Sequence, residues 1–306
     1  MTQDRAPEVI TGHPPEHRNP YRAILTTPGA LKFSASGVVA RLPMSMVGLG
    51  TILMIQIIYN EYSLAGRVAA AMNIAQAIAS PQIARLVDRF GQRRVLLPAI
   101  VLSSAGLAGL IACAVGHAPQ WTLYACAVVT GGSQGSFGAM VRARWTHVLP
   151  DARRLHTAYS LESALDELVF VVGPVVATVL ATSWFPAAGL LVPIVAALGG
   201  GLWFCAQRDT EPPVLAAGAG RARQRSAMAS VGMVVLALSF IGMGSIFGAI
   251  DVSIVAFATE HGHKNLSGAI LAVFATGSGI SSLLYGARHW VMAPQSTSQV
   301  SASVGQ

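Results

Sequence analysis

Long apolar runs separated by short polar turns dominate the chain. Most runs reach the roughly 20 residues that an α-helix needs to cross the hydrocarbon core of a bilayer. Because most of the turns between runs are short, successive helices must run antiparallel. The pattern predicts eight membrane-spanning helices, at residues 34–59, 65–84, 95–115, 121–141, 157–182, 187–206, 229–258 and 267–286.

The composition supports this interpretation. Hydrophobic residues make up 53% of the 306 residues and charged residues only 11%, whereas about a quarter of an ordinary globular chain is charged. A protein with so few charged residues exposes a largely apolar surface, which must be covered by lipid if the protein is not to aggregate. The predicted fold class is therefore an all-α, polytopic membrane protein with about eight transmembrane helices, and the lipid bilayer is its first expected partner.

The basic residues indicate how the chain is oriented. Seventeen of the twenty Lys and Arg residues fall in the tails and loops of one side, and the opposite loops carry only Lys264. The positive-inside rule then predicts a multi-pass protein of the cell membrane with a cytoplasmic N-terminus. The net charge of +7 follows from these loops, so no nucleic-acid partner is expected.

Polar segments divide the chain into expected units. A long basic, proline-containing connection follows the sixth run, a layout typical of transporters built from two helical bundles. The expected units are a disordered cytoplasmic tail (1–30), a six-helix bundle (31–206), a cytoplasmic linker (207–228), a partial second bundle of two helices (229–290) and a polar tail (291–306).

The turn between the second and third runs carries the most specific motif. It reads Arg-Leu-Val-Asp-Arg-Phe-Gly-Gln-Arg-Arg from Arg85 to Arg94. This segment resembles the signature loop of the major facilitator superfamily, written Gly-x-Leu-Ala-Asp-Arg-x-Gly-Arg-Arg. Ala84 and Val87 depart from that pattern. The matching residues are Leu86, Asp88, Arg89, Gly91, Arg93 and Arg94.

The residue types of this loop suit a conformational role. Gly91 allows a sharp reversal at the membrane surface, and Asp88 can accept hydrogen bonds from helix N-termini or pair with an arginine, which would stabilise one of two alternating conformations. The alternative is a basic turn that only obeys the positive-inside rule.

Two further segments resemble the same family less closely. Around Gln134-Gly135 the sequence is similar to the pattern Arg-x-x-Gln-Gly, but Gly131 stands where the arginine belongs. The resemblance gives that arginine a part in proton coupling. Gly173-Pro174 in the fifth run resembles the helix kink of the drug-efflux branch, which favours export; an ordinary kink at a helix contact is the alternative.

Charged residues inside the membrane are costly and are therefore candidates for function. The fifth run contains Glu162, Asp166 and Glu167, the first contains Arg41 and the seventh contains Asp251. The carboxylates can bind a proton, a cation or a substrate, and Arg41 can face a central cavity. Alternatively, the carboxylates only tie helices together by pairing with Arg41 or with loop arginines.

Other chemistry is not indicated. The pair His261-x-His263 lacks further ligands for a metal site, no phosphate-binding loop suggests ATP hydrolysis, and no nucleophile stands at a recognisable spacing from a base. We expect neither an enzyme nor a cofactor, and the proton gradient is the expected energy source.

Together these features predict a secondary transporter, with proton-coupled efflux of small amphipathic molecules as the first hypothesis. Uptake of a solute by the same fold is the alternative. Because the family has twelve spans and this sequence offers eight, the chain also looks truncated. A non-transporting membrane protein, or an oligomer that completes the second bundle, is therefore a further possibility.

Overall fold

The computed structural model describes residues 20–214, 231–263 and 266–287. This part of the chain is helical and contains no strand. The helices are α1 (Pro20–Leu25), α2 (Ala30–Tyr59), α3 (Tyr62–Phe90), α4 (Gln92–Val115), α5 (Gln120–Ser133), α6 (Phe137–Val148), α7 (Ala152–Ser183), α8 (Ala188–Ala206), α9 (Val231–Glu260) and α10 (Ser267–Ala287).

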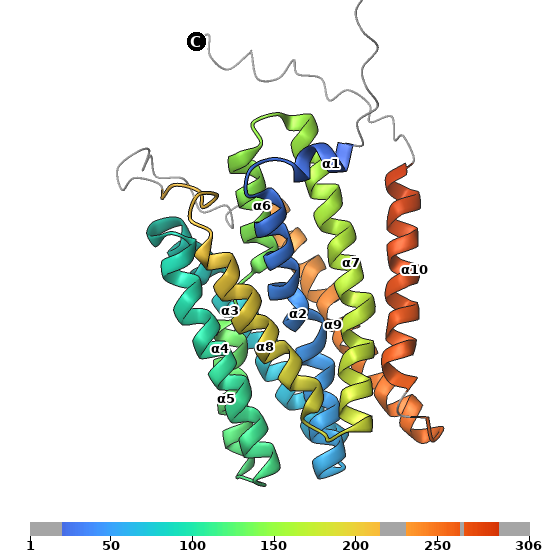
Figure 1. Cartoon of the computed structure of the whole chain (residues 1–306). Coiled ribbons are helices and arrows are strands. Elements are labelled where there is room, and N and C mark those ends of the chain that lie inside the picture. Colours follow the sequence, from blue (N-terminus) through green and yellow to red (C-terminus); the bar gives the residue numbers. More distant parts are fainter. Residues whose placement is uncertain (1–19, 215–230, 264–265, 288–306) are drawn as a thin grey trace, which may run out of the picture.

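Helix α2 lies at the centre of the bundle (Figure 1). It packs against α3, α7 and α8, and also against α4, α6 and α9. Its sequence is apolar all round, which is the composition of a helix surrounded by other helices. The helix ends at Tyr59. The next residue, Asn60, is left-handed with a φ of 51°, and its backbone N–H donates to the carbonyl of Gln56.

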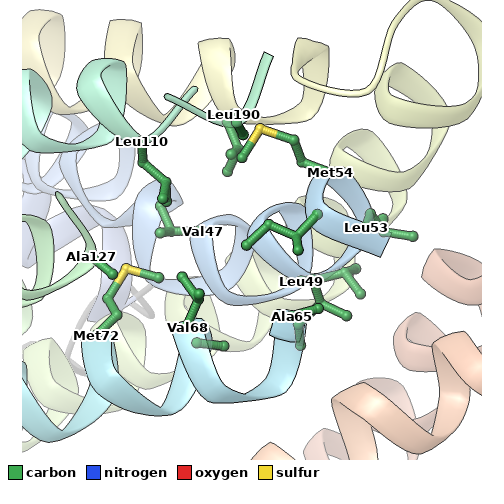
Figure 2. Close-up of a cluster of buried hydrophobic side chains, with 14 of the residues drawn as sticks. Val47, Leu49, Leu53, Met54, Ala65, Val68, Met72, Leu110, Ala127 and Leu190 are labelled. Atoms are coloured by element: carbon green, nitrogen blue, oxygen red, sulfur yellow. The ribbon is translucent and has the colours of Figure 1, made fainter. Parts of the chain in front are cut away.

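Two apolar clusters hold the bundle together. One gathers side chains from α2, α3, α4, α5 and α8, including Leu53, Val68 and Leu110 (Figure 2). The other lies towards the opposite end of α2, where the rings of Phe33 and Trp145 meet edge to face with centroids 4.8 Å apart. Dispersion and close packing, rather than water exclusion, are what hold helices together inside a bilayer.

The last two helices lie against the first bundle. Helix α10 packs along α7, and α9 contacts α2, α3 and α10 (Figure 1). Many side chains of α9 are exposed, among them Leu238, Phe240 and Ile241. The predicted linker is described only up to Val214, and the predicted C-terminal tail lies outside the described residues.

The structure differs from the sequence prediction in two places. The run 121–141 is not one helix, because the chain leaves helical geometry at Gln134–Ser136 and so separates α5 from α6. Part of the expected disordered tail is also ordered: α1 packs on α7, and its Ile24 side chain is buried. A short amphipathic turn of this kind is too brief to stand out from sequence.

Some of these helices can be assigned as membrane spans from their length and composition alone. Five helical stretches among the described residues are long and apolar enough to cross a bilayer: Ala30–Tyr59, Gln92–Val115, Ala152–Ser183, Ala188–Ala206 and Ala237–Glu260. Helix α3 is more polar, and the break shortens α5 and α6. These three helices are therefore not among the five, although they pack within the same bundle.

Candidate functional site

A buried ion-pair cluster joins α2 to α7. The guanidinium of Arg41 contacts the carboxylates of Glu162 at 2.5 Å and of Asp166 at 2.7 Å. The side chains of Arg41 and Glu162 are 1% and 0% exposed. Glu162 and Asp166 are four residues apart and therefore lie on one face of α7, as the sequence predicted. The structure thus brings these three candidate residues together.

Neighbouring groups complete the cluster. Glu162 also accepts hydrogen bonds from Ser34 Oγ at 2.7 Å and from Trp145 Nε1 at 2.8 Å. The second oxygen of Asp166 accepts one from Arg142 at 3.0 Å. Two guanidiniums thus face two carboxylates, so the formal charges balance. Pairing of this kind offsets much of the cost of burying charge in a low-dielectric interior.

Several members of this cluster were not predicted from the sequence. Arg142 was assigned to the cytoplasmic loop charges, and Trp145 and Ser34 were not considered. Nothing in the local pattern marks these residues, because their role depends on how α6 packs beside α2 and α7. An indole N–H generally finds a partner when it is buried, and this rule alone could have pointed to Trp145.

Glu167 points elsewhere. It is half-buried and lines a cavity of about 400 Å³ between the first bundle and the pair α9–α10. The wall combines amide groups with aromatic and aliphatic side chains. Among the lining residues that the structure describes, Glu167 is the one with a formal charge. Other lining residues include Met44, Gln76, Gln134, Phe170, Phe247 and Phe274.

The helix around Gly173-Pro174 is a point of close approach between three helices. A Cβ atom placed on Gly173 would lie 2.0 Å from Ser45 Oγ of α2. On α10, a Cβ placed on Gly268 would lie 2.4 Å from the carbonyl oxygen of Pro174. Small residues at such contacts let helix backbones approach closely in membranes. This motif therefore positions α7 against both α2 and α10, beside the cavity that Pro174 also lines.

Gly131 occupies a similarly tight place. A Cβ there would lie 2.0 Å from the backbone oxygen of Met72 in α3. The arginine of the family pattern cannot fit at this position without separating α3 from α5. Gln134 of the same pattern lies at the break between α5 and α6 and lines the cavity.

The signature loop lies at one end of the bundle, in the turn between α3 and α4. Gly91 makes the reversal with a φ of 89°, a region that favours glycine. Asp88 and Arg89 are exposed, and Arg89 lies over the ring of Phe90. Within the described part of the chain, Asp88 forms no hydrogen bond or ion pair. Its proposed conformational role remains a prediction.

A second buried arginine fixes this end of the bundle. Arg144 of α6 donates to Gln92 at the start of α4 and to Gln207 and Thr210 after α8, each at 2.9 Å. Its guanidinium also lies 3.8 Å from the ring centroid of Phe204. The cation–π contact helps to offset its burial. Arg144 therefore holds the α3–α4 turn beside the segment that follows α8.

The last candidate residue from the sequence is Asp251. Asp251 lies within α9, but its side chain falls outside what the structure describes. Its proposed role as a proton or substrate ligand stays a prediction.

A comparison with known families agrees with this architecture. The sequence model of the Major Facilitator Superfamily matches residues 33–291. The chain belongs to this superfamily. It is therefore a multi-pass membrane transporter rather than an enzyme, at the level that the family defines. No curated protein sequence matches the chain significantly.

Proposed function

We propose that this transporter exports small amphipathic molecules in exchange for protons. The observation that carries the proposal is the placement of Glu167 in a mainly apolar cavity of about 400 Å³. Aromatic and aliphatic walls suit the apolar part of a substrate, and a few polar groups fix its orientation. The carboxylate supplies a group that can bind and release a proton.

The ion-pair cluster supports Glu167 as the coupling group. Glu162 and Asp166 already face Arg41 and Arg142, so protonating either one would leave the cluster with one uncompensated positive charge. Glu167 makes no ion pair within the described part of the chain. Its protonation can therefore change during a cycle without breaking the contact between α2 and α7.

The site also lies where alternating access requires it. The cavity is bounded by α2, α3 and α7 of the first bundle and by α9 and α10. Substrate sites of secondary transporters lie at the interface between bundles, which rock about the bound molecule. In this proposal the signature loop around Asp88 and Gly91 acts on the cytoplasmic side of the cell membrane and biases one of the two conformations.

The test is transport by the purified full chain in proteoliposomes. Ethidium, an aromatic monocation, is loaded as the probe, and a proton gradient is imposed in each direction. We expect counterflow of ethidium and protons. Glu167→Gln should lose gradient-driven flux while keeping ethidium binding, because the cavity remains and the ionisable group is gone. The control Glu61→Gln changes an exposed carboxylate that contacts Arg67 and Ser63 at the surface and should transport normally.

Two results would contradict the proposal. Movement of ethidium in the same direction as the protons would indicate uptake by the same fold. Gradient-driven flux that is unchanged in Glu167→Gln would remove Glu167 from the coupling step, whatever the direction of transport.

A further inference from the structure

A basic hollow lies at the end of the bundle that carries the signature loop, between the α3–α4 turn and the segment after α8. Its volume is about 550 Å³. Arg93, Arg94 and Arg208 line it, together with one acidic residue, Glu211. The hollow therefore has a formal excess of two positive charges, which makes it complementary to an anion.

The charges in the basic hollow are available to a ligand. Glu211 is already engaged, since its Oε1 accepts the backbone N–H of Arg93 at 2.9 Å. In the described chain, the side chains of the three arginines form neither ion pairs nor hydrogen bonds. Arg94 and Arg208 are exposed and Arg93 is half-buried. A guanidinium presents paired N–H donors that match the oxygens of a phosphate.

An apolar groove of about 400 Å³ adjoins the basic hollow, and the two share Phe90 and Arg94. The groove runs along α3 and α4 and is lined by Leu86, Pro98 and Leu102, among others. Leu86 is 45% exposed and Leu102 is 53% exposed. In a membrane-spanning bundle, such a surface faces hydrocarbon chains.

We propose that the basic hollow and the apolar groove together bind one anionic phospholipid. Its phosphate lies between Arg94 and Arg208, and one acyl chain follows Leu86 and Leu102. Basic pockets between helices at a membrane surface suit anionic headgroups. A soluble phosphate would satisfy the arginines but would leave the groove without a role, which is why a lipid is the better match. Such a lipid would connect the signature loop to the segment that follows α8.

Native mass spectrometry of the full chain in detergent tests the headgroup part of the proposal. The chain is titrated with dioleoylphosphatidylglycerol or dioleoylphosphatidylcholine. We expect one phosphatidylglycerol to bind at least about tenfold more tightly than phosphatidylcholine. The double substitution Arg94→Gln with Arg208→Gln should remove this preference, and the Lys versions should restore part of it. The control pair Arg85→Gln with Arg153→Gln also removes two positive charges from the predicted cytoplasmic side, but outside the basic hollow and the apolar groove. This variant should bind phosphatidylglycerol normally.

A second arm tests the apolar groove and separates a lipid from a free phosphate. Leu102→Gln should weaken phosphatidylglycerol binding, while the control Val101→Gln should not, because Val101 is equally exposed, at 56%, but lies outside the groove. Glycerol phosphate at the same concentration should fail to displace the lipid. Three results would overturn the proposal. They are equal binding of phosphatidylglycerol by Leu102→Gln and Val101→Gln, full displacement of the lipid by glycerol phosphate, and an unchanged preference for phosphatidylglycerol in the arginine double variant. Leu102→Gln keeps the test decisive if the arginine variant does not fold.

Discussion

At the residue scale, the defining feature is the compensation of buried charge between α2 and α7. The carboxylate of Glu162 accepts hydrogen bonds from Arg41, Ser34 and Trp145. Three donors thus surround one carboxylate, and each donor in turn has its hydrogen-bonding need met. The cluster is therefore a single unit, in which the loss of one member affects the others.

This unit leads to a stability prediction. Glu162→Gln removes one negative charge and leaves Arg41 with Asp166 alone, so unfolding should become easier by about 3 kcal/mol or more. Thermal unfolding in detergent, followed by circular dichroism, measures the change. Glu61→Gln breaks the exposed pair with Arg67 and should leave the midpoint almost unchanged. Equal midpoints for the two variants would show that the buried cluster does not stabilise the fold.

The sequence predicted part of this cluster and not the rest. Charged residues within apolar runs are conspicuous, so Arg41, Glu162 and Asp166 could be singled out and their pairing anticipated. Arg142 and Trp145 lie at a polar helix end where such residues are common. Their contacts follow from the packing of α6, which a single sequence does not reveal. Which carboxylate faces the cavity was also beyond the sequence, since Asp166 and Glu167 are neighbours on one helix.

At the scale of the elements, glycines decide how closely the helices approach. The contact of α5 with α3 depends on Gly131, whose hydrogen points at the backbone of Met72. The adjacent Gly132 is less restricted, because a Cβ there would lie 4.0 Å from the nearest atom, the Cβ of Ala75. Two neighbouring glycines of the same helix thus have different structural importance.

The two glycines form a matched test. Gly131→Ala should destabilise the protein by about 1–3 kcal/mol, because the added methyl group forces α3 and α5 apart. Gly132→Ala should be neutral or slightly stabilising, because alanine favours the helix over glycine by up to about 1 kcal/mol. Unfolding midpoints in the same detergent give the comparison. A larger loss in Gly132→Ala than in Gly131→Ala would contradict the described packing of α5.

Hydropathy predicted the positions of the helices well, with ends that differ by a few residues. It failed at Gln134–Ser136, where the helix breaks inside a continuous run. The local sequence, Gly-Gly-Ser-Gln-Gly-Ser, is rich in weak helix formers, but glycine is common in membrane helices and did not distinguish a break from a packing contact. The break needs polar partners for its backbone groups, and its position beside the cavity provides room for them.

At the scale of the whole molecule, the antiparallel order of the helices and the distribution of basic residues predict the topology. Pro119, between α4 and α5, should face the outside, whereas Ala152, at the start of α7, should face the cytoplasm. In a background with Cys113, Cys126 and Cys205 replaced by alanine, an impermeant maleimide added to intact cells should label Pro119→Cys and not Ala152→Cys. The opposite labelling would reverse the orientation.

The charge balance around Arg41 has an electrical consequence for the proposed exchange. Because that cluster is neutral, a cycle that protonates only Glu167 carries one proton inward. Export of an uncharged substrate then moves one elementary charge, so a membrane potential contributes about 2.3 kcal/mol per 100 mV to the cycle. Export of a monocation moves none. In proteoliposomes clamped with potassium and valinomycin, flux of a neutral probe should therefore follow the imposed voltage, while ethidium flux should respond to the pH difference alone.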